Sequence, residues 1–190
     1  MSTLAVTNIK NASATNTAIV LDTNGRVQAY STISVGNATP SSSGAGITFP
    51  AAVSASSNAN TLDDYEEGTF TPTIIGSTSA GTGTYAGGGQ VGTYTKIGRL
   101  VNVSIYLEWT AHTGTGNMYI SGLPFTPASE TAGSIGLINN ITLSANNVPF
   151  VMTFLDGTIR FWQSPVAGGG GGYVSIDTSA YVYVSANYTV

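Results

Sequence analysis

The chain contains no cysteine, which excludes disulfide bonds, thiolate catalysis and cysteine-ligated metal sites. No apolar run approaches the roughly 20 residues that a membrane-spanning helix needs, so we expect no insertion into a membrane. Five Lys and Arg residues provide no basic footprint for a nucleic acid. Residues 1–17 lack a basic segment followed by an apolar one, so we expect synthesis in a cytoplasm without signal-peptide export.

Charge is scarce and unevenly placed. Only 7% of the residues are charged, as nine acids and five bases. Four acids lie within five positions, and without them five acids face five bases, so this cluster accounts for the whole net charge of −4. A surface with so few Lys and Glu residues lacks the usual protection against self-association. We therefore expect an obligate oligomer. The clustered acids are Asp63, Asp64, Glu66 and Glu67.

The composition predicts an all-β protein, because helical periodicity is almost absent and Val, Ile, Thr and Tyr are frequent. Residues 1–60 contain short alternating segments, a turn signal at 22–25 and a linker-like segment at 36–46. None of these segments carries enough apolar surface to fold alone. We interpret residues 1–60 as an extended arm or stalk that intertwines with other copies or attaches to another protein.

Residues 61–190 have the pattern of a globular domain. Residues 100–109 alternate strictly between apolar and polar side chains, which predicts a half-buried strand. Asp156-Gly157 between two apolar segments predicts a hairpin with a type I′ turn, and residues 77–89 predict a glycine-rich loop. About eight short strands separated by turns favour an antiparallel β-sandwich resembling a jelly roll.

Several segments resemble those of tail-fibre and virion structural proteins of tailed phages. These are residues 46–50 (GITFP) with 60–72 (NTLDDYEEGTFTP), then 92–99 and 120–125, and the repetitive β-segment at 6–27. The resemblance implies a short homotrimeric tail fibre in the virion. Its N-terminus would attach to a tail adaptor or nozzle protein, and its C-terminal domain would contact a host-surface glycan. The alternative is a capsid decoration or cement protein that binds the major capsid protein and stabilises the shell.

The four clustered acids could hold Ca²⁺, because hard cations prefer carboxylate oxygens. Their spacing lacks the alternation of an EF-hand loop. We expect Asp63, Asp64, Glu66 and Glu67 to cap a turn or to form contacts between subunits. No metal or other cofactor is expected.

No catalytic constellation is recognisable, so we expect a protein that is not an enzyme. His112 is the only histidine, and we expect it in an exposed turn without the motif of a serine hydrolase. Paired carboxylates could still cleave a glycosidic bond, which leaves a polysaccharide depolymerase as a third class. Exposed aromatic rings could contact a sugar instead. Tyr85 in the glycine-rich loop and Tyr173 beside five consecutive glycines are the candidate receptor contacts; Trp162 is either a further contact or a packing residue.

Overall fold

The chain divides into two compact units, Met1–Asp64 and Tyr65–Val190. The described residues form strands and loops without a helix, and thus include no helix long and apolar enough to cross a membrane. The all-β prediction is therefore confirmed for the part of the chain that is described. The computed structural model describes residues 8–9, 19–21, 24, 26–29, 32–53 and 55–190.

The N-terminal unit contains two small sheets. The first is antiparallel and consists of β1 (Asn8–Ile9), β2 (Ile19–Leu21) and β3 (Val27–Ala29). Leu21 pairs with Val27, as expected for a hairpin here, although turn residues 22, 23 and 25 lie outside the described residues. In the second sheet, β4 (Ile33–Ser34) pairs in parallel with β5 (Ile47–Thr48), and the predicted linker connects them. The attachment role of residues 1–60 stays a prediction.

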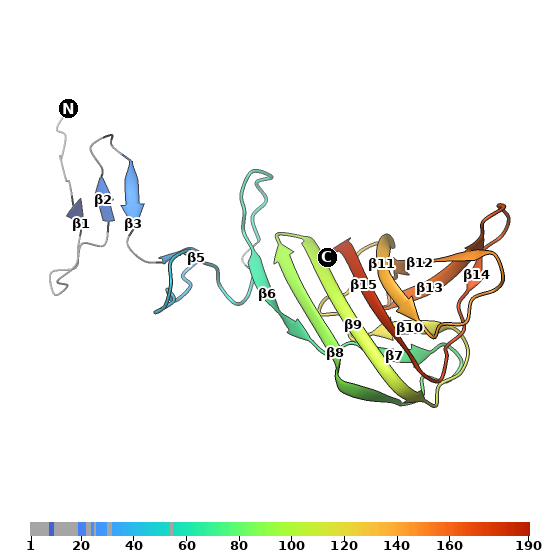
Figure 1. Cartoon of the computed structure of the whole chain (residues 1–190). Coiled ribbons are helices and arrows are strands. Elements are labelled where there is room, and N and C mark those ends of the chain that lie inside the picture. Colours follow the sequence, from blue (N-terminus) through green and yellow to red (C-terminus); the bar gives the residue numbers. More distant parts are fainter. Residues whose placement is uncertain (1–7, 10–18, 22–23, 25, 30–31, 54) are drawn as a thin grey trace. The chain divides into compact units, whose positions relative to one another are not determined.

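The C-terminal unit is built on one ten-stranded antiparallel sheet, which curls strongly in Figure 1. Its order is β6-β8-β9-β15-β11-β12-β13-β10-β7, and β14 pairs with β13. The strands are β6 (Tyr65–Phe70), β7 (Thr73–Gly76), β8 (Gly83–Ile97), β9 (Leu100–His112), β10 (Met118–Ser121), β11 (Thr131–Asn139), β12 (Asn147–Thr153), β13 (Ile159–Pro165), β14 (Gly172–Tyr173) and β15 (Ala180–Thr189).

This pairing differs from the expected sandwich of two sheets and does not show a jelly-roll order. Strands β6 and β7 are consecutive in the chain, yet they lie at opposite ends of the strand order. The sheet must therefore curl until its ends approach each other. Two hydrogen bonds link β8, the neighbour of β6, to β7 and the connection before it: the Ile74 N–H donates to the Tyr85 hydroxyl (2.9 Å), and Gln90 Nε2 donates to the Pro72 carbonyl (3.1 Å). The alternation of apolar and polar residues in the sequence shows which side chains point inward. It does not show whether the strands belong to one curled sheet or to two packed sheets.

The core lies on the inner side of this curl. On β9 the side chains of Val101, Val103, Ile105, Leu107 and Trp109 are at most 2% exposed, and the residues between them are more exposed. This confirms the strand predicted at residues 100–109. The facing residues of β15 alternate in the same way. Further buried apolar side chains come from β7, β10, β12 and β13: Ile74, Met118, Ile120, Val151, Ile159 and Phe161.

Two predicted turns differ in detail. The hairpin at Asp156-Gly157 is confirmed. However, three residues, 155–157, lie between the hydrogen-bonded residues Phe154 and Thr158, whereas a type I′ turn has two. Gly157 has a φ of +76° and its N–H donates to the Phe154 carbonyl, while the Phe154 N–H donates to the Thr158 carbonyl. The glycine-rich segment is only partly a loop, because β8 already begins at Gly83 and contains register shifts on either side of Tyr85. Bulges of this kind accommodate extra residues within a strand.

We predict that Gly92→Ala destabilises the C-terminal unit. Gly92 pairs with Phe70 across β6 and β8, and an added Cβ would lie 2.6 Å from the Phe70 ring. Forcing the ring aside should cost about 1–3 kcal/mol, since overpacking strains a filled core. The matched control is Gly87→Ala, where nothing lies within 4 Å of the added atom. Thermal unfolding should show a lower Tm for Gly92→Ala and an unchanged or higher Tm for Gly87→Ala; equal Tm values would contradict the packing described.

Candidate functional site

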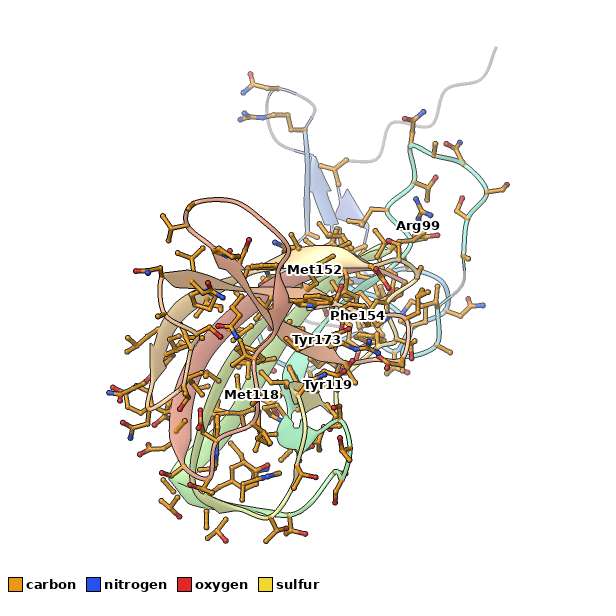
Figure 2. The ribbon with its side chains drawn as sticks, turned by 90° about the vertical axis from the view of Figure 1, so that its right-hand side faces the viewer. Arg99, Met118, Tyr119, Met152, Phe154 and Tyr173 are labelled. Carbon is orange, nitrogen blue, oxygen red and sulfur yellow. The ribbon has the colours of Figure 1, made fainter. Side chains whose placement is uncertain are left out.

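A continuous group of aromatic side chains covers the outward face of β10, β12, β13 and β14. These side chains alternate with the buried residues of the same strands, so they project away from the core. Figure 2 shows Phe154, Tyr173 and Tyr119 near one another on the side that faces the viewer. We call this surface the aromatic strip; its members are Phe150, Phe154, Trp162, Tyr173 and Tyr119, together with Arg160.

Neighbouring strands set the spacing of the rings. Phe150 pairs with Trp162, and their rings are stacked with centroids 6.4 Å apart and an interplanar angle of 12°. Trp162 pairs with Tyr173, and their centroids are 3.9 Å apart. Tyr173 in turn lies 6.0 Å from Tyr119. Because the rings come from four strands of one sheet, they form a platform with little freedom to rearrange.

Arg160 lies between two rings of the strip. Its guanidinium carbon is 4.8 Å from the Tyr119 centroid and 3.9 Å from the Phe154 centroid. Arg160 Nη2 donates to Asp156 Oδ2 at 2.5 Å, and Nε donates to Thr158 Oγ1 at 3.2 Å. These contacts hold the guanidinium in one position, as cation–π and charge-assisted hydrogen bonds do.

Asp156 is fixed by the hairpin that carries it. Its Oδ1 accepts hydrogen bonds from the Thr158 hydroxyl (2.6 Å) and the Thr158 N–H (3.2 Å). Burial alone would raise the pKa of this carboxyl, but the hydrogen bonds from Thr158 and Arg160 outweigh it and lower the pKa below its ordinary value. The Asp156 side chain is 52% exposed and that of Arg160 is 20% exposed. The carboxylate is thus the accessible member of the pair.

Trp162 carries an unpaired donor. Its indole Nε1 is buried and has no hydrogen-bond partner in the described part of the chain. A buried polar group without a partner is uncommon in native proteins and calls for an explanation. The other tryptophan, Trp109, donates instead to the Asp177 carbonyl at 2.9 Å.

A second outward surface lies on the opposite half of the sheet. Four side chains pair in a row across β8, β9, β15 and β11, and we call them the tyrosine row: Val91, Tyr106, Tyr183 and Leu137. The rings of Tyr106 and Tyr183 are stacked at 4.6 Å. The Tyr106 hydroxyl donates to Glu108, which raises the pKa of Tyr106 to about 12. The row is therefore apolar, with one tyrosine hydroxyl already engaged.

The structure places the two predicted tyrosines differently. Tyr173 lies in the aromatic strip, on β14 after the glycine run. Tyr85 lies on β8, packs against the core and accepts the hydrogen bond from Ile74. Burial raises the pKa of Tyr85, against the effect of that bond. The surroundings of Tyr85 are those of a packing residue, although a receptor contact here stays a prediction.

The four clustered acids do not act as one group. Asp63 Oδ2 accepts a hydrogen bond from the Ser56 N–H at 2.6 Å, seven residues earlier in the chain. Asp64 is buried, with 4% exposure. Glu66 and Glu67 lie on β6 and accept hydrogen bonds from Tyr94 and Tyr65, respectively. These bonds are the main reason why the pKa values of both tyrosines are raised.

Among the described residues, no three His, Asp or Glu side chains gather as metal ligands would. A contact of the acids with another subunit stays a prediction.

The expectation of an exposed His112 is wrong. This residue ends β9 and is 7% exposed. The Gly114 N–H donates to its Nδ1 at 2.9 Å, and its Nε2 lies 3.0 Å from the Ile74 carbonyl. Because Nδ1 accepts a hydrogen bond, the proton of the neutral imidazole lies on Nε2, which donates to the carbonyl. His112 therefore links β9 to β7. Extending the alternation of residues 100–109 would have turned Ala111 inward and His112 outward; the register shift between Thr84 and Tyr85 reverses this phase.

Sequence reasoning missed most of the aromatic strip. Phe150 and Arg160 were not considered, although both occupy outward positions of the predicted hairpin. Tyr119 lies on a short strand far away in the sequence and meets the hairpin only through sheet pairing. The alternation within residues 159–163 could have indicated that Arg160 and Trp162 share a face.

We predict that Asp156→Asn weakens the hairpin in a pH-dependent manner. Asparagine keeps an acceptor for Thr158 but removes the charge facing Arg160. Because the folded pKa of Asp156 is lowered, its contribution is present above the ordinary carboxyl pKa and disappears as the pH falls through the folded value. At pH 7 the loss should be about 0.5–1 kcal/mol, as for solvent-screened pairs. Thermal unfolding should show a gap from wild type at pH 7 that closes as the pH falls below the ordinary carboxyl range; a constant gap would contradict the charge effect.

No known protein family and no curated protein matches this sequence. Among solved structures, the fold is similar to that of the Dettilon tailspike protein, with a TM-score of 0.52 and 19% sequence identity. The match covers 66% of this chain and 24% of the tailspike chain. The match thus spans about a quarter of that protein's length, and it shows a similarity of fold alone.

Proposed function

We propose that this chain is a virion protein of a tailed bacteriophage, and that it forms a short homotrimeric tail fibre. The observation that carries the proposal is the fold likeness to a tailspike. Residues 1–60 attach the fibre to a tail adaptor or nozzle protein, and the C-terminal unit contacts the host surface. Fold likeness alone leaves function open, so the argument also needs a surface suited to contact.

The aromatic strip is that surface. It combines partly exposed rings with the accessible Asp156 carboxylate and the Arg160 guanidinium. Aromatic faces pack against the C–H side of a sugar, while charged groups bond its hydroxyls. The strip therefore contacts a host-surface glycan. Three such surfaces in a trimer, and several fibres on a particle, provide avidity without tight single contacts.

The tyrosine row supports association of identical chains. Val91, Tyr183 and Leu137 are 44%, 46% and 47% exposed. Adjacent exposed apolar side chains on three strands are typical of an interaction surface. The chain has few charges to oppose contact between copies. We assign the row to the contacts between subunits.

The fibre binds its glycan without cleaving it. Glycosidic hydrolysis ordinarily uses two carboxyl groups on either side of the bond. Among the described residues of the strip and its hairpin, Asp156 supplies one carboxylate, and Arg160 already holds it. Incubation with host polysaccharide should therefore release no shortened products; release of such products would make the protein a depolymerase.

We predict a copy number of a few to several tens per particle, divisible by three. Quantitative mass spectrometry of purified particles against the major capsid protein measures it directly. A count in the hundreds that follows the number of capsid subunits would contradict the fibre. That result would identify a capsid decoration or cement protein instead.

We predict that Val91→Lys disrupts the trimer, because it places a charge within the apolar row. Val148→Lys is the matched control: Val148 is also an exposed strand valine, at 51%, but lies on β12. Native mass spectrometry of the full chain should show trimers for wild type and Val148→Lys and smaller species for Val91→Lys. If all three proteins form trimers, the tyrosine row does not lie in the interface between subunits.

A further inference from the structure

The charge balance of the aromatic strip indicates what kind of ligand it accepts. Residues 117–128 and 144–176, which include β10, β12, β13 and β14, contain only two charged residues, Asp156 and Arg160. These two are joined at 2.5 Å and cancel each other. The strip therefore offers a neutral surface that contains one strong donor and one strong acceptor.

This pair disfavours charged ligands of either sign. A carboxylate or phosphate on the ligand would meet the exposed Asp156 oxygen before it reached Arg160, which lies between Tyr119 and Phe154. A cationic ligand would compete with Arg160 for Asp156, whose other oxygen is engaged by Thr158. A hydroxyl group avoids both conflicts, because it donates to the carboxylate and accepts from the guanidinium.

The rings next to the pair supply the apolar contact. Trp162 and Tyr173 lie 3.9 Å apart, and Phe150 continues the stack on the other side of Trp162. A pyranose ring presents C–H groups on one face and hydroxyls around its edge, which suits an aromatic platform bordered by polar groups. The indole N–H of Trp162 is buried, so Trp162 contributes its ring to the ligand contact and not its N–H.

We propose that the aromatic strip is a binding site for a neutral saccharide. Trp162 and Tyr173 form the platform, and the Asp156–Arg160 pair bonds the sugar hydroxyls. This inference rests on the proposed glycan contact and adds to it the ligand class and the residues that select it. Uncharged hexose polymers are expected ligands, whereas polyuronates and phosphorylated glycans are excluded by the exposed carboxylate.

The test measures binding of the full-length protein to immobilised glucan, mannan, galactan and polygalacturonate by biolayer interferometry. Wild type should bind at least one neutral polymer and should not bind polygalacturonate. Trp162→Ala and Tyr173→Ala should each weaken neutral binding at least tenfold, which is about 1.4 kcal/mol. Trp162→Phe retains the ring without the N–H, so its loss should be smaller. The control Tyr65→Ala removes an exposed aromatic ring on β6 and should bind as wild type does.

Asp156→Asn tests the selection by charge. This variant leaves the Arg160 charge uncompensated, so it should gain measurable binding to polygalacturonate, which wild type lacks. Wild-type binding to polygalacturonate alone, or to none of the neutral polymers, would overturn the inference. So would neutral binding that Trp162→Ala and Tyr173→Ala leave intact. The copy number and the mass of the trimer are measured independently of saccharide binding. A failed saccharide test would therefore not contradict the assignment as a tail fibre.

Discussion

The inward row of β9 is the constraint on which the rest of the sheet depends. Five side chains from Val101 to Trp109 are buried at alternate positions, and β15 pairs with this strand along its length. A shift of one residue would turn the whole row toward solvent, so burial fixes the register. The same alternation turns Tyr106 and Tyr183 outward, and alternation on β13 turns Trp162 and Arg160 outward. Both outward surfaces thus follow from how the core is packed.

The two surfaces offer different chemistry. The tyrosine row is apolar, and the Tyr106 hydroxyl is already bonded to Glu108. The aromatic strip keeps an exposed carboxylate and an unpaired indole N–H. An apolar row suits a permanent contact between copies, since burial drives such contacts. Rings beside an exposed carboxylate suit a ligand that binds and leaves.

Local signals in the sequence predicted local features. The alternation at residues 100–109 and the Asp156-Gly157 turn gave the strand and the hairpin, since both depend on neighbouring residues. Long-range pairing was less accessible. That β6 and β7 end a single curled sheet, and that His112 bonds the Ile74 carbonyl, depends on residues far apart in the chain. Tyr119 joins the aromatic strip for the same reason, and the glycines around Tyr85 concealed the early start of β8.

The two tryptophans allow the most direct test of the account, because one lies in the core and the other in the aromatic strip. Titrating the ¹⁵N-labelled protein with surface polysaccharide from the host bacterium would report on both indole N–H groups, with Trp162→Phe assigning the signals. The account predicts that the Trp162 signal shifts, while that of Trp109, bonded to the Asp177 carbonyl, stays in place. Binding that leaves the Trp162 signal unchanged would contradict it.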